Sequence, residues 1–175
     1  MSTELVDVMN ESGEVVTTLS REEAEKLNHL TQNVLVFLFD SDGRVWIQKR
    51  PMNKKHFPSL WDISACGGVS SGEDLTKAVK REVLEETGLE TKLIYVESFL
   101  NEFPGHNDQT FRRLSHLYIG ITNEIPKENR EVDEFRAYHY KKLAANVAKS
   151  PSKYVPSFLL ELNKAVKAYK KQKDI

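Results

Sequence analysis

Glutamates are concentrated in one short segment of the chain, where a glycine-rich turn leads into a predicted helix. Residues 67–89 read GGVSSGEDLTKAVKREVLEETGL. Glu82 stands three residues before Glu85 and four before Glu86, so the three carboxylates share one helix face. Like charges at these spacings repel each other by about 0.2–0.5 kcal/mol per pair in water, and more where the face is partly buried. A divalent cation would remove this repulsion, and carboxylates clustered without Cys or His suit a hard ion, Mg²⁺ or Mn²⁺.

The helix that carries these glutamates is predicted over residues 74–87. Glu73 and Asp74 suit the positive end of a helix, and Gly88 stands where a C-terminal cap is expected. Apolar residues at a spacing of four form the buried stripe, namely Leu75, Val79 and Val83. The alternative to a metal site is a solvated acidic face whose charge is offset by basic neighbours, namely Lys77, Lys80 and Arg81.

The complete segment resembles the Nudix box, G-x5-E-x7-R-E-U-x-E-E-x-G-U, in which U is a bulky aliphatic residue. Every fixed position of the motif is filled in this chain, by Gly67, Glu73, Arg81, Glu82, Val83, Glu85, Glu86, Gly88 and Leu89. Fixed residues at fixed spacing over this length are a far more specific signal than a short glycine pattern. The resemblance therefore favours a metal site over a solvated face.

Nudix enzymes resembling this chain cleave a diphosphate that is linked to another moiety, usually in a nucleotide. The resemblance implies that Glu82, Glu85 and Glu86 hold the metal ions. It also implies that a backbone carbonyl at Cys66 or Gly67 completes the metal shell. Such ions lower the pKa of a water, neutralise the phosphate oxygens and stabilise the leaving phosphate.

The same resemblance gives supporting roles to other acidic and basic residues. Arg81 would orient a glutamate through a charge-assisted hydrogen bond, and Glu73 would brace the loop against the helix. One of the glutamates, or a carboxylate from a later loop, would take the proton of the attacking water. For this later element we predict Glu134, in the acidic run before FRAYHY, as a metal ligand or base. A solvated loop is the alternative interpretation of that run.

The approach to the box is similar to the branch of Nudix proteins that includes isopentenyl-diphosphate isomerase. It reads WIQKRPMNKKHFPSLWDISAC. We expect Arg50 and Lys49 to meet substrate phosphate, with an exposed strand end as the alternative. We expect Phe57 and Trp61 to wall a base or an apolar group, with plain core packing as the alternative. His106, in the loop NEFPGHNDQT, is a candidate to bind or gate the substrate.

Cys66 aligns with the catalytic Cys of the isomerase, but the partners that the isomerase needs are missing. Gly67 and Gly68 stand where the isomerase has a metal-binding His. The isomerase also needs histidines upstream of the first core strand, where this chain has only His29 nearby. It needs a Glu-x-Glu pair on a later strand, and residues 112–120 of this chain contain no acidic residue. We therefore do not favour isomerisation, and we interpret Cys66 as a small buried structural residue.

The remaining patterns predict a mixed α/β chain. Strands are predicted at residues 6–9, 15–19, 34–39, 44–50, 93–100, 114–121 and 135–140. A capping box at Ser20 and Glu23 predicts a short helix that ends at about Leu30. The continuous apolar run at 34–39 indicates a strand buried on both faces. This order of elements predicts an α/β/α sandwich with a mixed β-sheet, which is also the fold that the Nudix resemblance implies.

Length and composition favour one domain over residues 1–175, with the N-terminal hairpin and helix in about 1–30 and a closing helix in about 152–173. The chain has 175 residues, of which 39% are hydrophobic, enough for a sizeable core. Its single Cys excludes an internal disulfide. No apolar run reaches the length of a membrane span, and the start MSTELVDVMN does not resemble a signal peptide. We therefore expect a cytoplasmic protein.

The C-terminal segment is basic although the whole chain carries a net charge of −1. Its apolar residues recur at helical spacing, namely Phe158, Leu159, Leu162, Val166 and Tyr169, and the lysines fall mostly on the other face. With Pro156 expected in the first turn, this indicates a helix packed on the domain rather than a nucleic-acid-binding tail. A homodimer is left open.

The leading interpretation is a Mg²⁺- or Mn²⁺-dependent hydrolase that acts on a small-molecule diphosphate, in a nucleotide or a nucleoside-diphosphate-linked compound. The alternative is a non-hydrolytic protein, either a relative of the isomerase or a ligand-binding protein that kept the fold. A ligand-binding relative is expected to lose box glutamates, and this chain keeps all of them.

Overall fold

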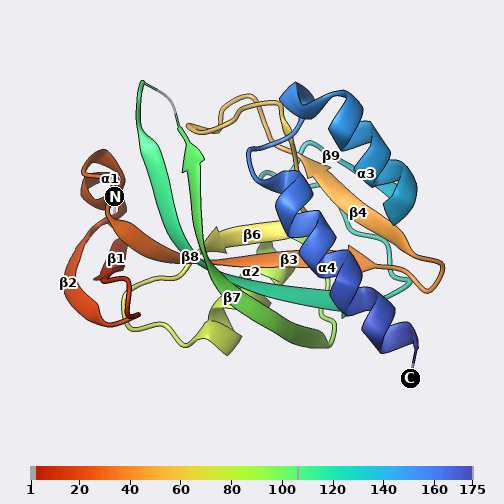
Figure 1. Cartoon of the computed structure of the whole chain (residues 1–175), viewed down its shortest axis with the longest axis horizontal. Helices are drawn as coiled ribbons and strands as arrows, with labels where there is room; N and C mark the ends of the chain where they lie inside the picture. The colour runs from red at the N-terminus through yellow and green to blue at the C-terminus, as the bar shows by residue number, and fades with distance from the viewer. Residues whose placement is uncertain (1–2, 106, 175) are drawn as a thin grey trace.

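The computed structural model describes residues 3–105 and 107–174. Its elements are β1 (Leu5–Met9), β2 (Val15–Ser20), α1 (Arg21–Lys26), β3 (Leu30–Phe39), β4 (Arg44–Lys49), β5 (Trp61–Asp62), β6 (Ala65–Gly68), α2 (Leu75–Thr87), β7 (Leu93–Pro104), β8 (Thr110–Ile121), β9 (Glu134–His139), α3 (Tyr140–Lys149), the short 3₁₀ helix η1 (Pro151–Lys153) and α4 (Phe158–Lys173). Figure 1 shows α4 crossing one side of a twisted sheet, with α2 on the other side.

The main sheet has seven strands and is mixed, as predicted. Five strands follow the order β5-β4-β3-β8-β7, while β6 pairs with β3 and β9 pairs with β4. The β3–β8 pair is parallel, and the other pairs are antiparallel. The central strand β3 therefore brings β6, which directly precedes the acidic helix, next to the middle of the sheet.

Both faces of β3 are buried, which explains its continuous apolar run. Alternate residues of the strand point to opposite faces, because side chains in a strand alternate. One set packs with residues of α3 and α4, namely Leu35, Phe37 and Phe39. The other set packs with residues of α2, namely Val34, Val36 and Leu38. The predicted α/β/α sandwich is confirmed.

The N-terminal hairpin and its helix form a third, smaller apolar cluster beside the main sheet. β1 and β2 pair antiparallel, and Ser20 and Glu23 form the predicted capping box of α1. The helix is shorter than predicted, because it ends at Lys26 and β3 already begins at Leu30. The hairpin lies at one end of the molecule, next to the start of β3 (Figure 1).

The C-terminal region differs from the prediction in two respects. Helix α3 was not predicted from the sequence, and α4 begins at Phe158 rather than at about residue 152. The chain is extended before α4 because the backbone N–H of Val155 donates to the carbonyl of Trp61 at 2.9 Å. Pro156 therefore precedes the helix instead of lying in its first turn.

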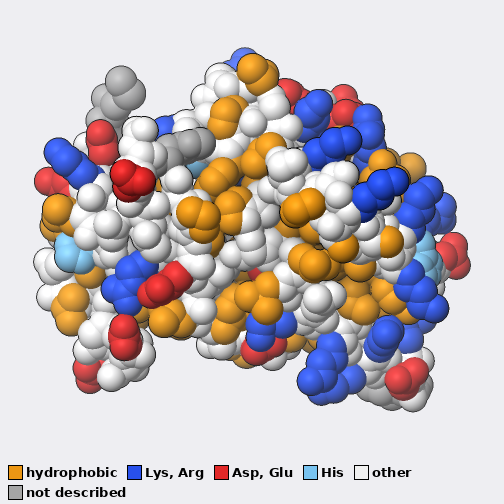
Figure 2. Space-filling model, turned by 45° about the horizontal axis from the view of Figure 1, so that its top comes forward, with side chains coloured by type: hydrophobic (Ala, Val, Ile, Leu, Met, Phe, Trp, Pro, Cys, Tyr) orange, Lys and Arg blue, Asp and Glu red, His pale blue; other side chains and the backbone are white. Residues whose placement is uncertain are grey.

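The apolar face of α4 packs on the sheet as predicted, and its lysines remain at the surface. Phe158 and Leu162 are buried, and the ring of Tyr169 stacks on Phe39 with 4.4 Å between ring centroids. Figure 2 shows Lys and Arg side chains gathered at the end of the molecule where α3 and α4 lie. Within the described ranges, no helix is long and apolar enough to cross a membrane.

Candidate active site

Helix α2 begins and ends where the sequence predicts, and this fixes the position of the glutamates. The Oδ1 atom of Asp74 accepts hydrogen bonds from the backbone N–H groups of Thr76 and Lys77, at 2.9 and 3.2 Å. Gly88 closes the helix with a φ of 70°, a left-handed conformation that suits glycine. Val79 and Val83 are buried against the sheet. Glu82 and Glu86 therefore point toward β6, beside the buried stripe.

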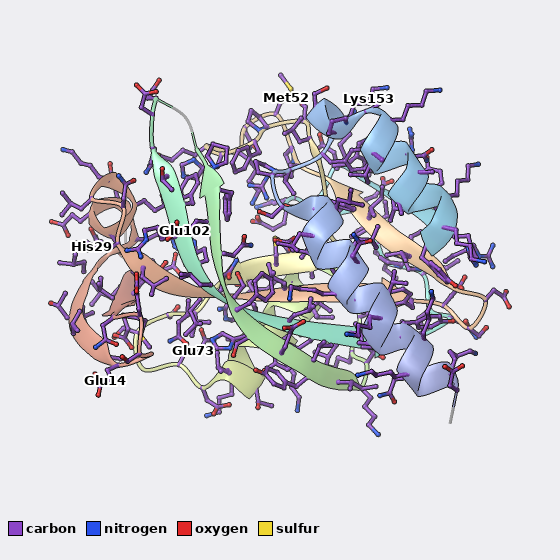
Figure 3. The ribbon with its side chains drawn as sticks, in the orientation of Figure 1. Glu14, His29, Met52, Glu73, Glu102 and Lys153 are labelled. Carbon is purple, nitrogen blue, oxygen red and sulfur yellow. The ribbon has the colours of Figure 1, made fainter. Side chains whose placement is uncertain are left out.

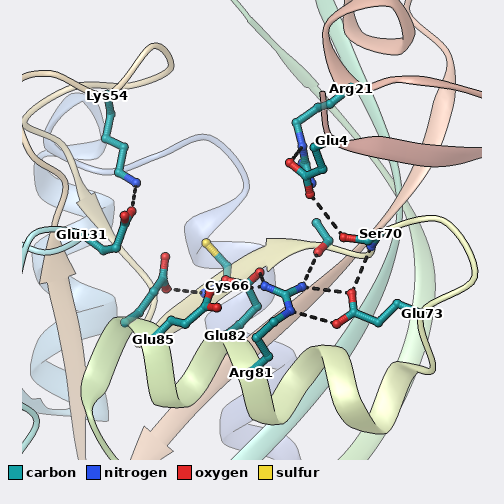
Figure 4. Close-up of polar contacts among 12 residues, drawn as sticks. Glu4, Arg21, Lys54, Cys66, Ser70, Glu73, Arg81, Glu82, Glu85 and Glu131 are labelled. Carbon is teal, nitrogen blue, oxygen red and sulfur yellow. Dashed lines mark hydrogen bonds and ion pairs between the residues drawn. The ribbon is translucent and has the colours of Figure 1, made fainter. Parts of the chain in front are cut away.

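Arg81 is the centre of a hydrogen-bonded network (Figure 4). Its Nε and Nη2 atoms donate to the two carboxylate oxygens of Glu73, at 2.8 and 3.0 Å. Its Nη1 atom donates to Glu82 at 2.6 Å and to Glu85 at 3.3 Å. Nη2 also reaches the carbonyl of Gly68 at 3.2 Å. Arg81 thus contacts three of the four glutamates of the motif and links the helix to β6.

Glu73 lies in the loop that leads into α2, where Figure 3 labels it, and it is hydrogen-bonded to that loop and to Arg81 of the helix. Its Oε2 atom accepts a hydrogen bond of 3.0 Å from the backbone N–H of Ser70. The bond from Arg81 is the main reason why the pKa of Glu73 is lowered, and the Ser70 bond adds to this effect. Glu73 is therefore a charged brace between loop and helix.

Glu82 lies directly against the backbone of Gly67. A Cβ atom placed on Gly67 would lie 2.1 Å from the Cδ atom of Glu82, so only glycine fits this position while the carboxylate keeps its place. Glu82 is 9% exposed. Burial raises its pKa, and the hydrogen bond from Arg81 opposes that rise. The first glycine of the motif therefore creates the space for the Glu82 carboxylate.

Glu86 is held by two donors at the inner end of the site. Its Oε2 atom accepts hydrogen bonds of 2.8 Å from the backbone N–H of Cys66 and from the Nε2 atom of Gln48. The side chain is 7% exposed, and burial, reinforced by the charge of Glu82, raises its pKa to about 8. Gln48 was not predicted as a site residue. Its position in the alternating strand β4, facing inward, is the only sequence signal for its role.

The chemistry of this donor set fits a hard divalent cation. Glu85 raises the pKa of Glu82, and Glu82 raises that of Glu86, so a cation bound among them would relieve real repulsion. In the described residues no group of three or more Asp, Glu, His or Cys side chains is already arranged as a metal site. The Nη1 atom of Arg81 instead bridges Glu82 and Glu85. Arg81 uses one oxygen of each carboxylate, Glu82 Oε1 and Glu85 Oε2, which leaves the other oxygen of each for a cation.

A cleft of about 520 Å³ lies over these carboxylates. Its lining combines residues from the N-terminal region, β3, β6, α2, β8 and α4, including Arg21, Glu25, Leu35, Arg50, Lys54, Phe57, Cys66, Glu82, Glu85, Glu86, Phe103, Phe111, Arg113, Glu131, Val155, Pro156 and Glu161. Of the substrate-contacting residues predicted from sequence, Arg50 and Phe57 line this cleft. His106 lies outside the described residues.

Arg50 and Cys66 meet at Asp62 inside the cleft. The Nη1 atom of Arg50 donates to Asp62 Oδ2 at 2.9 Å, and its Nε atom donates to the carbonyl of His56 at 3.1 Å. The Cys66 thiol donates to the same Asp62 oxygen at 3.6 Å. Burial raises the pKa of the thiol well above its usual range, with the negative charge of Asp62 adding to it. A thiol in this state is a poor nucleophile, in keeping with a structural Cys66.

Three predicted contacts are placed elsewhere. Trp61 packs at the edge of the core under the guanidinium of Arg136, which lies 4.8 Å from its ring centroid. Lys49 is next to Trp61 in the sheet register and does not line the cleft. Glu134 pairs with Arg136 outside the cleft. Lys49 follows Gln48 in β4, so the two side chains point to opposite faces of the sheet. Trp61 and Glu134 are the partners of Lys49 on the neighbouring strands and share its face. All three side chains therefore lie on the far side of the sheet from Glu86, which Gln48 contacts.

Glu131 is the member of the later acidic run that reaches the cleft. It is ion-paired with Lys54, from the loop after β4 (Figure 4). The backbone N–H of Glu131 donates to Asn129 Oδ1 at 2.8 Å, and Asn129 Nδ2 donates to the carbonyl of Glu86 at 2.8 Å. Asn129 thus ties this loop to the end of α2. Within the predicted acidic run, Glu131 lines the cleft, whereas Glu134, the residue predicted from the sequence, does not.

Comparison with known proteins gives a family model and several relatives. The family model, described as NUDIX domain, matches residues 29–158. An isopentenyl-diphosphate Delta-isomerase of Pectobacterium atrosepticum is 27% identical over 141 residues, covering 81% of this chain and 77% of the relative. A Nudix hydrolase of Listeria innocua, described as uncharacterized, is 30% identical over 157 residues, covering 88% of this chain and 89% of the relative.

The fold also matches solved structures. The crystal structure of DR0079 from Deinococcus radiodurans superposes with a TM-score of 0.78, covering 93% of this chain and 99% of that one. Its sequence identity is 24%, so this similarity concerns the fold.

Proposed function

Because this chain belongs to the Nudix family, we propose that it hydrolyses a diphosphate bond with the help of Mg²⁺ or Mn²⁺, in a nucleotide or a nucleoside-diphosphate-linked substrate. One observation carries the proposal. Glu82, Glu85 and Glu86 line the same cleft as Arg50 and Phe57, so carboxylates for a cation face groups suited to phosphate and to an organic moiety. The curated Nudix relative covers most of this chain, which supports the hydrolase assignment.

The carboxylates of Glu82, Glu85 and Glu86, with a backbone carbonyl at Cys66 or Gly67, would hold the cation. When bound, a divalent cation lowers the pKa of a coordinated water and neutralises phosphate oxygens. Gln48 and the Cys66 N–H keep the Glu86 carboxylate in place for this role. Arg81 would be kept beside these carboxylates by Glu73, which accepts hydrogen bonds from it with both oxygens.

Basic side chains around the cleft would bind the phosphates. Arg21, Arg50 and Arg113 all line it, each held by a carboxylate of the protein, and their positive charges suit phosphate oxygens. Arg113 is buried and pairs with Glu25 at 3.2 Å, which fixes its direction. We assign the proton-accepting role to Glu131, the carboxylate of the later loop that lines the cleft opposite α2.

Isopentenyl-diphosphate isomerisation is the second candidate, because the names of several curated relatives favour it. Two observations weigh against it. The Cys66 thiol donates to Asp62, and its pKa is raised well above the usual range. The strand β8 contains no Asp or Glu that could serve as the second acid–base group.

The experiment that tests the proposal is phosphate release from a panel of nucleotides and nucleotide conjugates, with Mg²⁺ or Mn²⁺ and with EDTA. We expect turnover of at least one compound with metal and none with EDTA. Glu86→Gln should reduce that turnover about 100-fold or more, since it removes a charged ligand. Glu90→Gln, at an exposed glutamate beyond the helix, is the matched control and should not change it. Absence of metal-dependent turnover on every compound would overturn the proposal, and isomerisation of isopentenyl diphosphate would favour the second candidate.

A further inference from the structure

The first strand of the N-terminal hairpin is hydrogen-bonded to the loop of residues 69–74, which joins β6 to α2. The backbone N–H of Ser71 donates to the carbonyl of Leu5 at 2.8 Å. The side chain of Asp7 adds two contacts, because its Oδ1 atom accepts from Ser71 Oγ at 2.6 Å and its Oδ2 atom accepts from the backbone N–H of Gly72 at 3.2 Å. The bond from Ser71 is the main reason why the pKa of Asp7 is lowered. A charged Asp7 therefore holds two consecutive residues of this loop.

Arg21, the first residue of α1, makes a second contact at the end of β6. A Cβ atom placed on Gly68 would lie 2.0 Å from the Nη2 atom of Arg21, so the guanidinium lies directly on the glycine backbone. Glu4 fixes the guanidinium there, since its two oxygens accept from Nε at 2.7 Å and from Nη2. Figure 4 shows this pair above the loop, where Ser70 Oγ makes a weak contact of 3.5 Å with Glu4.

The end of β6 is enclosed between Arg21 and Glu82. An added Cβ at Gly67 would meet Glu82, whereas an added Cβ at Gly68 would meet Arg21. Successive residues of a strand point to opposite faces, so these two side chains lie against opposite faces of β6. Arg21 is therefore the group that keeps the β6 backbone against the Glu82 carboxylate.

We propose that Asp7 and Arg21 are positioning residues for the cation, because they keep the backbone carbonyl at Cys66 or Gly67 at the distance from Glu82 that a shared ion requires. This rests on the cation site of the proposed function. A small divalent cation such as Mg²⁺ tolerates little variation in ligand distance, so the position of β6 affects its affinity. Both residues precede position 29, where the match to the family model begins. The N-terminal hairpin thus adds to the site from outside the family domain.

The test measures the dissociation constant of Mn²⁺ by calorimetry on metal-free protein, without substrate, so a contact of Arg21 with phosphate does not enter it. Arg21→Met should weaken Mn²⁺ binding about 10-fold. Loss of the positive charge alone would strengthen cation binding, so the sign of the change separates position from charge. Asn10→Ala is the matched control, because Asn10 Oδ1 accepts from the N–H groups of Ser12 and Glu14 in the hairpin turn, away from the loop. It should lower the melting temperature and leave the Mn²⁺ affinity unchanged.

Ser71→Ala tests the same contact from the loop, without a change of charge and with the hairpin sequence intact. It should weaken Mn²⁺ binding about 3-fold, since it removes one of the two side-chain contacts of Asp7 with the loop. Combined with Asp7→Ala, its effect should be less than additive, because both variants remove the same hydrogen bond. This variant decides the question if Arg21→Met does not fold.

An unchanged or tighter Mn²⁺ affinity in folded Arg21→Met, or an unchanged affinity in Ser71→Ala, would overturn the inference even if the melting temperature falls, since that is the mark of a purely structural role. An equal loss of affinity in Asn10→Ala would overturn it as well. Weaker Mn²⁺ binding in Arg21→Met and Ser71→Ala without turnover of any diphosphate would support the inference and count against hydrolysis alone. A wild-type protein that does not bind Mn²⁺ would overturn both.

Discussion

The side-chain amide of Gln48 donates a 2.8 Å hydrogen bond to the Oε2 atom of Glu86, although the two residues are 38 positions apart. Gln48 is 2% exposed, and its Nε2 atom also donates to the carbonyl of Ser64 at 3.2 Å. The carboxylate at the inner end of the site is therefore oriented by a neutral amide from β4, together with the backbone of β6. Such supporting contacts determine where a ligand group points.

Replacing Gln48 by Met should lower metal-dependent activity while keeping the side-chain volume. We expect a loss of about 10-fold or more, mainly as a higher metal concentration for half-maximal activity, because Glu86 loses one of its two donors. The measurement is activity as a function of Mg²⁺ and Mn²⁺ concentration. Gln32→Met, which removes an amide paired with His116 instead, is the control and should leave that dependence unchanged. An unchanged metal dependence in Gln48→Met would mean that the amide does not position Glu86.

Gly67→Ala should reduce activity with little loss of stability. The new Cβ atom would lie 2.1 Å from the Cδ atom of Glu82, and the flexible end of that side chain can move away while the fold stays intact. We expect activity to fall about 10-fold or more, because a displaced carboxylate no longer fits the site.

Gly13→Ala is the matched control for Gly67→Ala. Gly13 has a φ of +83° and no neighbouring atom within 4 Å of an added Cβ. This variant should lower the free energy of unfolding by about 1–2 kcal/mol, through backbone strain alone, and leave activity intact. Urea unfolding and kinetics on both proteins check the contrast, and equal activity of the two variants would contradict it.

Glu131 and Glu134 should differ in their effect on catalysis, although both belong to the same acidic run. Glu131 lines the cleft and pairs with Lys54, whereas Glu134 pairs with Arg136 outside it. Glu131→Gln should lower kcat about 100-fold if it accepts the proton, since general base catalysis contributes roughly 10²–10⁴-fold. Glu134→Gln should have no more than a small effect. A larger loss of kcat in Glu134→Gln than in Glu131→Gln would instead assign the proton-accepting role to Glu134.

Stability should fall as pH rises through the neutral range, in part because of Glu161. Burial raises the pKa of this group to about 8 in the folded protein, above its ordinary value. At low pH both states hold the proton, and as pH rises the unfolded state releases it first. The folded state then holds a proton on Glu161 that the unfolded state has lost. The free energy of unfolding therefore decreases between about pH 5 and pH 8.

Glu161→Gln should flatten this decrease, because the amide does not titrate. The change is measured as the difference in the free energy of unfolding between pH 5 and pH 8, by urea unfolding of metal-free protein. Glu124→Gln, at an exposed residue, is the control and should show the same difference as the wild-type protein. An equally steep decrease in Glu161→Gln would show that other groups carry the pH dependence.

The sequence determined those features that depend on neighbours within a few residues. The caps at Asp74 and Gly88 and the stripe at Val79 and Val83 are local, and they set both ends and the buried face of α2. The spacing of the motif then put the glutamates on the adjoining face. The continuous apolar run in β3 was enough to predict a strand covered on both sides, because burial on both faces removes the usual polar alternation.

Only the tertiary structure decided which distant residues meet those glutamates. Gln48 reaches Glu86 because β4 and β6 both lie beside β3, and Glu161 enters the cleft because α4 packs across the same sheet. Neither residue shows a local pattern that differs from an ordinary polar position. The choice of Glu131 over Glu134 has the same cause, since strand pairing of β9 with β4 directs Glu134 away. Periodicity and capping are properties of adjacent residues, whereas these contacts depend on strand order, register and packing across the whole chain.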